Sequence, residues 1–148
     1  MEVEVDTETG HVKILRMENV VDCGTPINPK IVETQLSGAA IMQIGISMFE
    51  EMVFDENGQL RNASFSEYKI PGMQDIPPTI GTEMAQAQQS NGPFGAKGVG
   101  ESATFGVASA LAEAIEDAVG VRLTSLPLKP EAVYRAMAAA RGETFDTP

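Results

Sequence analysis

The chain has 148 residues, enough for one domain with a real core, and its 43% hydrophobic and 21% charged residues are those of an ordinary folded protein. Its net charge of -11 argues against nucleic acid and anionic membranes as partners, because both attract lysine and arginine. No run of 18 apolar residues is present to span a membrane.

The first element that the pattern predicts is a β-hairpin. Val3 and Val5, and then Val12 and Ile14, alternate with charged residues on either side of a glycine-closed turn at 6–10. Alternation of this kind is typical of two strands with one buried face. The second strand of the hairpin could continue to about position 21.

A long helix is expected next. Asn28 is a favoured N-cap residue, and Pro29 suits the first helical position. The run that follows, as far as Ile44, is apolar around nearly its whole circumference in the later turns, which is typical of a helix buried within a larger body. We therefore expect a long buried helix from Asn28 into the forties, with small residues at 37–40 that allow a close approach to its backbone.

The rest of the chain predicts shorter elements, among which Asn57-Gly58 is a specific turn signal. In chain order these are a second hairpin over 52–65, a proline-punctuated loop over 68–78, a short strand within 79–88, a helix over 102–119 that ends at Gly120, a short strand within 121–126 and a last helix over 130–140. Together the elements predict a single α+β domain over residues 1–141 and a flexible tail over 142–148.

The stretch from Gly95 to Ser102 is the most informative feature of the sequence. Its three glycines deliver one carboxylate, Glu101, to the start of an apolar, alanine-rich segment. Glycine lets a backbone approach a ligand closely, and a helix N-terminus offers unpaired N–H groups. The functional interpretation is a cofactor-edge loop that carries a catalytic carboxylate. The structural alternative is an ordinary glycine-rich turn with a glutamate favoured by the helix dipole.

Other sites have weaker support. A P-loop or a dinucleotide fingerprint does not fit, because Gly98 follows Lys97 and Ala103 stands where a third glycine is needed. His11 is interpreted as a surface residue. Nothing indicates that Glu50 forms an acid–base pair with the glutamate that follows it, or that Ser102 belongs to a serine hydrolase. Cys23, the single cysteine, cannot form an internal disulfide, which is compatible with a reducing compartment, and we expect a cytoplasmic location.

The order of the motifs along the chain is far more specific for a protein family than any single motif. The collinear series is Asp22-Cys23-Gly24, Ile27-Asn28-Pro29, Gln35 with Gly38, Gly45, Glu50, Tyr68-Lys69-Ile70-Pro71, Asp75-Ile76-Pro77, Gly92-Pro93, the loop Gly95–Glu101, Leu126-Pro127 and Pro130-Glu131. This series resembles the C-terminal part of the molybdenum-binding (molybdopterin) subunit of the xanthine dehydrogenase/aldehyde oxidase family. The resemblance covers essentially the entire chain.

The resemblance implies a mechanism for the loop. Family members hydroxylate an sp² C–H of an N-heterocycle, such as a purine, or of an aldehyde, with water as the oxygen source. Glu101 would be the general base on the Mo–OH group. The resemblance also implies a molybdenum–molybdopterin cofactor, in its plain or cytosine dinucleotide form, with no direct protein ligand to the metal. The residues implied to contact this cofactor are Gln35, Gly38, Lys97, Gly98, Val99 and Gly100.

Because family subunits are several times longer, we expect this chain to be either a piece of a longer protein or a naturally split subunit, inactive alone. The implied partners are the remainder of the molybdenum subunit, the domains or subunits that carry iron–sulfur clusters and FAD, and a small-molecule substrate. Nucleic acid and a membrane are not expected partners. The alternative function is a non-catalytic scaffold or interaction domain derived from the same fold, and retention of Glu101 favours the enzyme.

Overall fold

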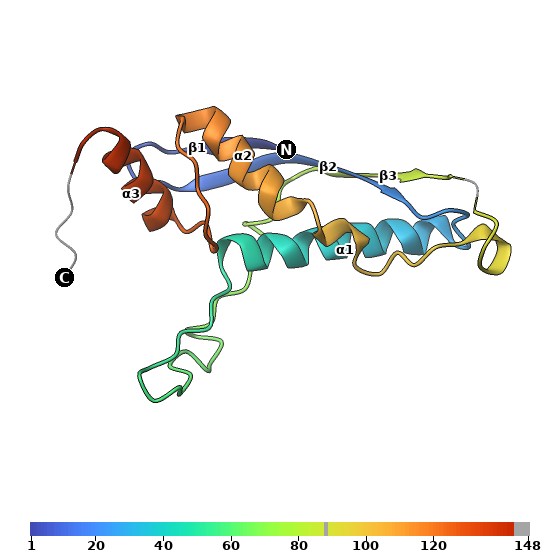
Figure 1. The fold of residues 1–148 in the computed structure, drawn as a ribbon, viewed down its shortest axis with the longest axis horizontal. Coiled ribbons are helices and arrows are strands. Elements are labelled where there is room, and N and C mark those ends of the chain that lie inside the picture. The colour runs from blue at the N-terminus through green and yellow to red at the C-terminus, as the bar shows by residue number, and fades with distance from the viewer. Residues whose placement is uncertain (88, 144–148) are drawn as a thin grey trace.

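The computed structural model describes residues 1–87 and 89–143, and these form the α+β arrangement predicted from the sequence. Three strands and three helices are joined by irregular segments, and the strands form a layer along which the longest helix runs (Figure 1). The bounds are β1 (Glu2–Val5), β2 (Val12–Asp22), α1 (Pro29–Met48), β3 (Ile80–Ala85), α2 (Val107–Val119) and α3 (Pro130–Ala140).

The sheet has the order β1-β2-β3, and β2 serves as its spine. The first part of β2 pairs with β1 as an antiparallel hairpin, which confirms the first predicted element, with Val5 opposite Val12. The second part of β2 pairs in parallel with β3, from Met17 opposite Ile80 to Asp22 opposite Ala85. The C-terminal ends of β2 and β3 therefore lie side by side at one end of the molecule.

The buried side chains fall into two clusters along α1. The larger one joins β2, the C-terminal half of α1, and the helices α2 and α3. The smaller one lies at the N-terminal half of α1, and its buried members are Cys23, Val32, Leu36, Ala39 and Ala103. The second cluster matters for function because Ala103 follows the glycine-rich loop directly.

Helix α1 begins where the sequence predicted. The Asn28 side chain accepts a 3.2 Å hydrogen bond from the backbone N–H of Ile31, and Pro29 opens the helix. Its burial is one-sided, however, in the described residues. Val32, Leu36, Ala40 and Ile44 are buried, whereas Ile31, Met42 and Ile46 are 59%, 42% and 41% exposed. The apolar circumference that suggested complete burial is thus half uncovered in this chain.

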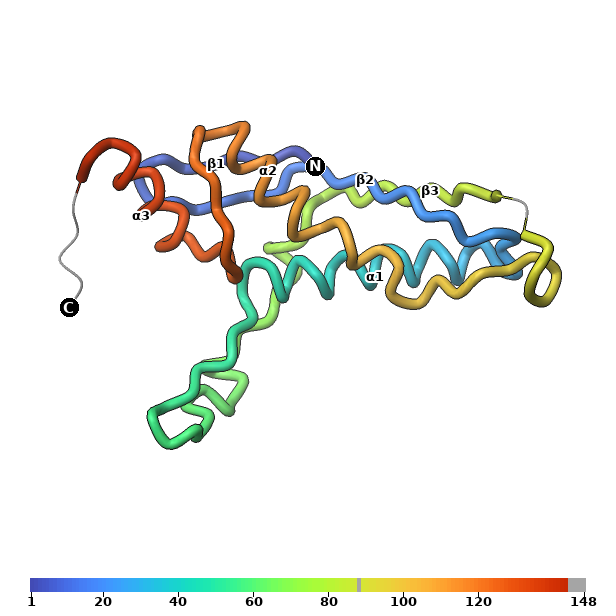
Figure 2. The backbone as a smooth tube through the Cα atoms, in the orientation of Figure 1, coloured from blue at the N-terminus to red at the C-terminus, as the bar shows by residue number. Residues whose placement is uncertain are grey.

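Two predicted β elements differ from the structure: the hairpin over 52–65 forms only next to its turn, and the predicted strand within 121–126 is not formed. The second hairpin is reduced to a single bridge between Phe54 and Leu60, inside an arm that extends away from the body (Figure 2). Its turn is held by Asp55, whose side chain accepts from the N–H groups of residues 57 and 59, but the flanking segments meet no sheet that would extend their pairing. The segment 121–126 is irregular, because it is anchored by side-chain burial at Val121 and Leu128 and not by a neighbouring strand.

Helix α2 begins at Val107, five positions later than the predicted start at Ser102. Residues Ser102–Thr104 form a 3₁₀ turn instead. The backbone N–H and the hydroxyl of Thr104 both donate to the Glu101 carbonyl, which favours the tighter turn, and Ala103 is drawn into the smaller cluster. The helix ends before Gly120, and α3 spans 130–140, both as predicted. Most of the predicted flexible tail, residues 144–148, lies outside the described residues.

Candidate functional site

The glycine-rich loop lies against the segment that leaves the end of β2. The Thr25 N–H donates to the Gly95 carbonyl, and the Lys97 N–H donates to the Cys23 carbonyl, both at 3.0 Å. Gly24 and Ala96 form an isolated antiparallel bridge between these two bonds. Segments at least seventy positions apart in the sequence are therefore joined as a short two-stranded ribbon. Residues 95–100 lie in no regular strand or α-helix, as expected for a loop.

Glycine is required on both sides of this ribbon. Gly24 has a φ of +60°, and a Cβ atom there would lie 2.2 Å from the Gly95 carbonyl oxygen. Gly95 has a φ of +76°, and its Cβ atom would lie 3.1 Å from the Gln89 carbonyl oxygen. Both residues adopt a left-handed backbone that disfavours a side chain. The ribbon is thus a close backbone contact that fixes where the loop begins.

An ion pair completes this contact. Asp22, the last residue of β2, pairs with Lys97 through one carboxylate oxygen and accepts a 2.9 Å bond from the Gly24 N–H through the other. That second oxygen also lies 3.4 Å from the donating Ala87 N–H. The hydrogen bond from Lys97, and then the one from Gly24, hold the pKa of Asp22 below its ordinary value. Sequence reasoning assigned no role to Asp22, because its partner is 75 positions away.

Glu101 stands at the far end of the loop, immediately before the 3₁₀ turn. Its side chain is exposed, while two positions later Ala103 is only 3% exposed, in the smaller cluster with Leu36 and Ala39. The carboxylate is therefore carried between a fixed ribbon on one side and a buried anchor on the other. A carboxylate held in this way can accept a proton from a ligand that lies against the loop.

The backbone between these anchors has N–H groups without partners in the described part of the chain, while the half-buried Val99 side chain packs against the smaller cluster. Within the described residues, the N–H groups of Gly98, Val99 and Gly100 donate to no backbone or side-chain acceptor. A Cβ atom on Gly98 or Gly100 would meet nothing within 4 Å. Unpaired donors and open space next to a carboxylate are the features that a polar ligand needs. The Lys97 ammonium differs, because it is directed to Asp22.

Gln35 and Gly38 lie on the same half of α1 as the smaller cluster, and both are exposed. The segment that follows Glu101 passes along this half of the helix (Figure 1) and packs on it through Ala103. The structure thus brings the residues predicted to contact a cofactor to one end of the molecule. A Cβ atom on Gly38 would meet nothing within 4 Å, so this part of α1 is open to a neighbour.

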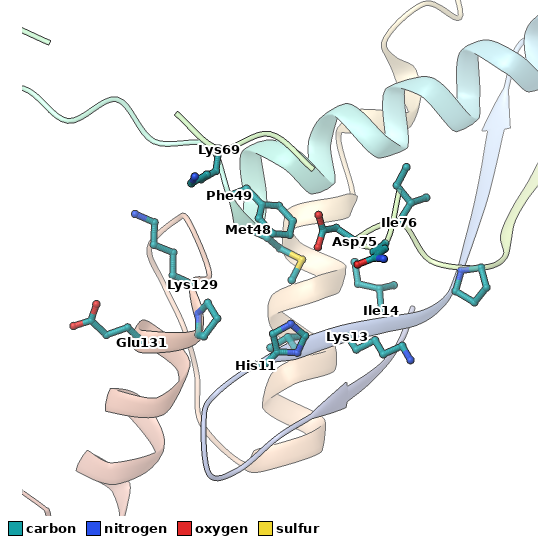
Figure 3. Close-up of a pocket in the computed structure, with 14 residues that line it drawn as sticks. His11, Lys13, Ile14, Met48, Phe49, Lys69, Asp75, Ile76, Lys129 and Glu131 are labelled. Atoms are coloured by element: carbon teal, nitrogen blue, oxygen red, sulfur yellow. The ribbon is translucent and has the colours of Figure 1, made fainter. Parts of the chain in front are cut away.

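A cavity of about 860 Å³ lies elsewhere, at the C-terminal end of α1 (Figure 3). Its walls come from β2, the end of α1, the loop before β3 and the start of α3, with Ile14, Met48 and Ile76 inside and charged side chains such as Lys69 and Glu131 around it. At about 1.5 Å per helical residue, Met48 is about 18 Å along α1 from Leu36. No residue of the predicted site lines this cavity.

The other candidate residues from the sequence show no sign of a second catalytic or metal site among the described residues. His11 is exposed at the edge of the cavity, as expected for a surface residue, and the Ser102 hydroxyl donates to the Gly98 carbonyl at 3.4 Å. In the part of the chain that the structure describes, no three histidine, cysteine, aspartate or glutamate side chains are grouped to hold a metal ion. Nor does any of the described helices have the length and apolar character needed to cross a membrane.

The chain is similar to known proteins over most of its length. The sequence model of the family described as "Molybdopterin cofactor-binding domain" matches residues 1–77. The gamma subunit of the 6-hydroxypseudooxynicotine dehydrogenase complex of Paenarthrobacter nicotinovorans is 36% identical over 136 residues, which cover 90% of this chain and 17% of that protein. The xanthine dehydrogenase molybdenum-binding subunit of Escherichia coli O157:H7 is 35% identical over 135 residues, which cover 90% of this chain and 18% of that subunit.

A solved structure gives the same result for the fold. Quinoline 2-oxidoreductase from Pseudomonas putida 86 superposes with a TM-score of 0.85 at 35% identity, over 91% of this chain and 17% of that one. The chain therefore spans about a sixth of the length of the relatives that it matches. The match extends beyond the fold to sequence identity across most of the chain.

Proposed function

The chain belongs to the molybdenum-binding subunits of the xanthine dehydrogenase/aldehyde oxidase family, and we propose that it forms the C-terminal part of a molybdenum hydroxylase in which Glu101 is the general base. The substrate is an N-heterocycle, such as a purine, or an aldehyde, oxidised at an sp² C–H with oxygen from water. The molybdenum–molybdopterin cofactor, when bound, supplies the redox centre and activates that oxygen. Glu101 accepts the proton that the oxygen loses.

One observation carries this proposal. Glu101 presents an exposed carboxylate at the end of a loop whose two preceding glycines have open space around them and whose N–H groups are unpaired among the described residues. The loop is nevertheless held at both ends, by the ribbon with residues 23–25 and by buried Ala103. A general base must be fixed and still be accessible to the ligand, and this arrangement meets both needs.

The chemistry of the open groups fits the cofactor. A molybdopterin carries many hydrogen-bond acceptors, and the N–H groups of Gly98, Val99 and Gly100 are donors that a polar edge can use. Gln35 adds an amide that can donate and accept, and Gly38 allows close approach to α1. Lys97 stands beside this set with its ammonium directed to Asp22. Gln35, Gly38 and residues 98–100 would hold the cofactor in its plain or its cytosine dinucleotide form.

The partners in this proposal are the remainder of the molybdenum subunit and the domains or subunits that carry iron–sulfur clusters and FAD. The exposed apolar side chains of Ile31, Met42 and Ile46 support the first of these. With Gln35 and Gly38 they recur every three or four positions, so they share one face of α1. Apolar faces of this kind mark a surface that another part of the protein covers.

The test is the substitution Glu101→Gln in the assembled enzyme. Glutamine keeps the shape of the side chain but cannot take the proton, so kcat should fall by about 10²–10⁴-fold. Molybdenum content per subunit should stay at the wild-type level. The matched control is Glu113→Gln, an exposed position on α2, which should leave both quantities unchanged. A Glu101→Gln enzyme that is fully loaded and fully active would overturn the assignment of the base and would mean that the glycine-rich loop is structural.

A further inference from the structure

We propose that Asp22 and Lys97 are positioning residues, which fix the glycine-rich loop to the end of β2 so that the Glu101 carboxylate is held at the reaction site. This inference rests on the proposed function, because it concerns how the same base is placed. In this inference the Lys97 ammonium holds the loop in place and does not contact the cofactor. Neither the sequence motifs nor the comparisons connect Asp22 with a role. The inference gives it one, which is to position the loop that carries the base.

The anchor on the Asp22 side is rigid. Asp22 ends the strand that forms the spine of the sheet, and it pairs there with Ala85 of β3. Its carboxylate accepts from the N–H groups of Gly24 and Ala87 in addition to Lys97, so its own rotamer is fixed by neighbours on two segments. A side chain held in this way can determine where a lysine on a loop must lie.

The loop side depends on this anchor. Lys97 is four positions before Glu101, and the intervening Gly98 and Gly100 have no side chain with which to pack. Between these two glycines, the half-buried Val99 side chain packs against the smaller cluster. On this side of Glu101, the ribbon consists of the two backbone bonds at Gly95 and Lys97, the close Gly24 contact and the ion pair. The ion pair is the part of this contact that lies nearest to Glu101 in the sequence and that involves a side chain.

Because the ion pair is partly exposed, its effect on the position of the loop can be distinguished from its effect on the stability of the fold. The side chains of Lys97 and Asp22 are 30% and 37% exposed, so water screens their attraction. Ion pairs as accessible as this contribute little to the stability of a fold. Their geometry still limits the motion of the loop, and a displacement of about 1 Å at a catalytic group can cost about 10² in rate. Loss of the pair should therefore slow the reaction far more than it destabilises the protein.

The experiment compares Lys97→Met, Lys97→Arg and Asp22→Asn in the complete molybdenum-binding subunit within its complex. Hydrogen–deuterium exchange is measured for the amides of residues 95–101 and for α2, together with kcat, KM, molybdenum content and melting temperature. We expect Lys97→Met and Asp22→Asn to increase exchange in the loop at least about tenfold and to lower kcat by about 10²-fold. Exchange in α2 and molybdenum content should be unchanged, and the melting temperature should fall only slightly. Lys97→Arg keeps the charge and should restore kcat to within a few-fold of wild type.

The outcomes distinguish the inference from the proposed function. Wild-type exchange and kcat in Lys97→Met, alongside an inactive Glu101→Gln enzyme, would overturn the positioning role and leave the base assignment standing. Loss of molybdenum from Lys97→Met with unchanged loop exchange would also overturn it, and would make Lys97 a cofactor contact. Faster loop exchange without a change in kcat, in an enzyme whose Glu101→Gln variant is also active, would overturn both.

Discussion

Tyr68 donates a 2.7 Å hydrogen bond to the Glu50 carboxylate across 18 positions, and this bond closes the base of the arm that lies between the two residues. The bond, together with the negative charge of Glu50, raises the pKa of the Tyr68 hydroxyl. The other Glu50 oxygen lies 2.3 Å from the position that a Cβ atom on Gly45 would take, and Pro71 lies 3.0 Å from the same position. Four of the motif residues that define the family resemblance thus meet at the end of α1, far from Glu101, and have a structural role there.

Gly45→Ala should therefore destabilise the protein. The added methyl group must displace the Glu50 carboxylate from Tyr68 and press on Pro71, and we expect a loss of about 1–3 kcal/mol in the free energy of unfolding. Urea unfolding measures this loss. Tyr68→Phe removes the same hydrogen bond and should cost about 1 kcal/mol. The two changes should be less than additive in the double variant, and full additivity would contradict the shared contact.

The sequence predicted those parts of the fold that depend on neighbouring residues. The Asn28 cap, the Pro130 start of α3 and the first hairpin follow from contacts within a few positions, and all three are found. The pairs Asp22–Lys97 and Glu50–Tyr68 have no local signal, because each depends on the tertiary path between distant segments. The glycine loop could be identified, but its anchorage could not.

The start of α2 and the burial of α1 were mispredicted for a related reason. Apolar periodicity shows that a surface is covered, but not by which part of a protein. Ala103 packs into the smaller cluster, and α2 therefore begins only at Val107. Ile31 and Met42 are apolar and exposed. The exposed apolar face of α1 is therefore covered, in our proposal, by a surface that lies outside this chain.

Gly38→Ala tests that proposal. A Cβ atom at this exposed helical position meets nothing within 4 Å, and alanine is a better helix former than glycine. The chain itself should gain about 0.5–1 kcal/mol of stability. Assembly with the rest of the subunit, or molybdenum content, should decrease at the same time, because the methyl group occupies the space where the neighbour approaches. Size-exclusion chromatography and metal analysis measure these, and wild-type values for both would show that nothing packs on Gly38.

The polypeptide of these 148 residues, purified alone, should bind no stoichiometric molybdenum and have no hydroxylase activity. The reason is that it spans about a sixth of the length of its relatives and supplies only one side of the proposed cofactor site. Metal analysis by mass spectrometry after expression with a molybdenum supply is the measurement. One molybdenum per chain would show that the loop and α1 suffice to hold the cofactor.

The Asp22 pair predicts a specific dependence of stability on pH. The folded pKa of Asp22 lies below the ordinary value of 3.8, chiefly because of Lys97. A lowered carboxyl pKa contributes stability at every pH above the ordinary value, and this contribution is lost as the pH falls through the folded pKa. The urea midpoint of the wild type should therefore exceed that of Asp22→Asn by a constant amount from neutral pH down to about 4. The difference should shrink below 3.8. A difference that grows on acidification would contradict the pairing.

The last prediction concerns the open glycines beside Glu101. Gly98 has no left-handed backbone, and a Cβ atom there would meet nothing within 4 Å, so Gly98→Ala should leave the stability of the fold unchanged within about 0.5 kcal/mol. In the assembled enzyme the same methyl group would stand between the loop backbone and the proposed cofactor, and molybdenum content or kcat should fall at least about tenfold. Gly24→Ala is the matched contrast, because its Cβ atom would lie 2.2 Å from the Gly95 carbonyl oxygen on a left-handed backbone. That change should cost about 1–3 kcal/mol of stability through the ribbon itself. A Gly98→Ala enzyme with full cofactor and full activity would mean that no ligand approaches the loop backbone, and the open space beside Glu101 would then have no catalytic use.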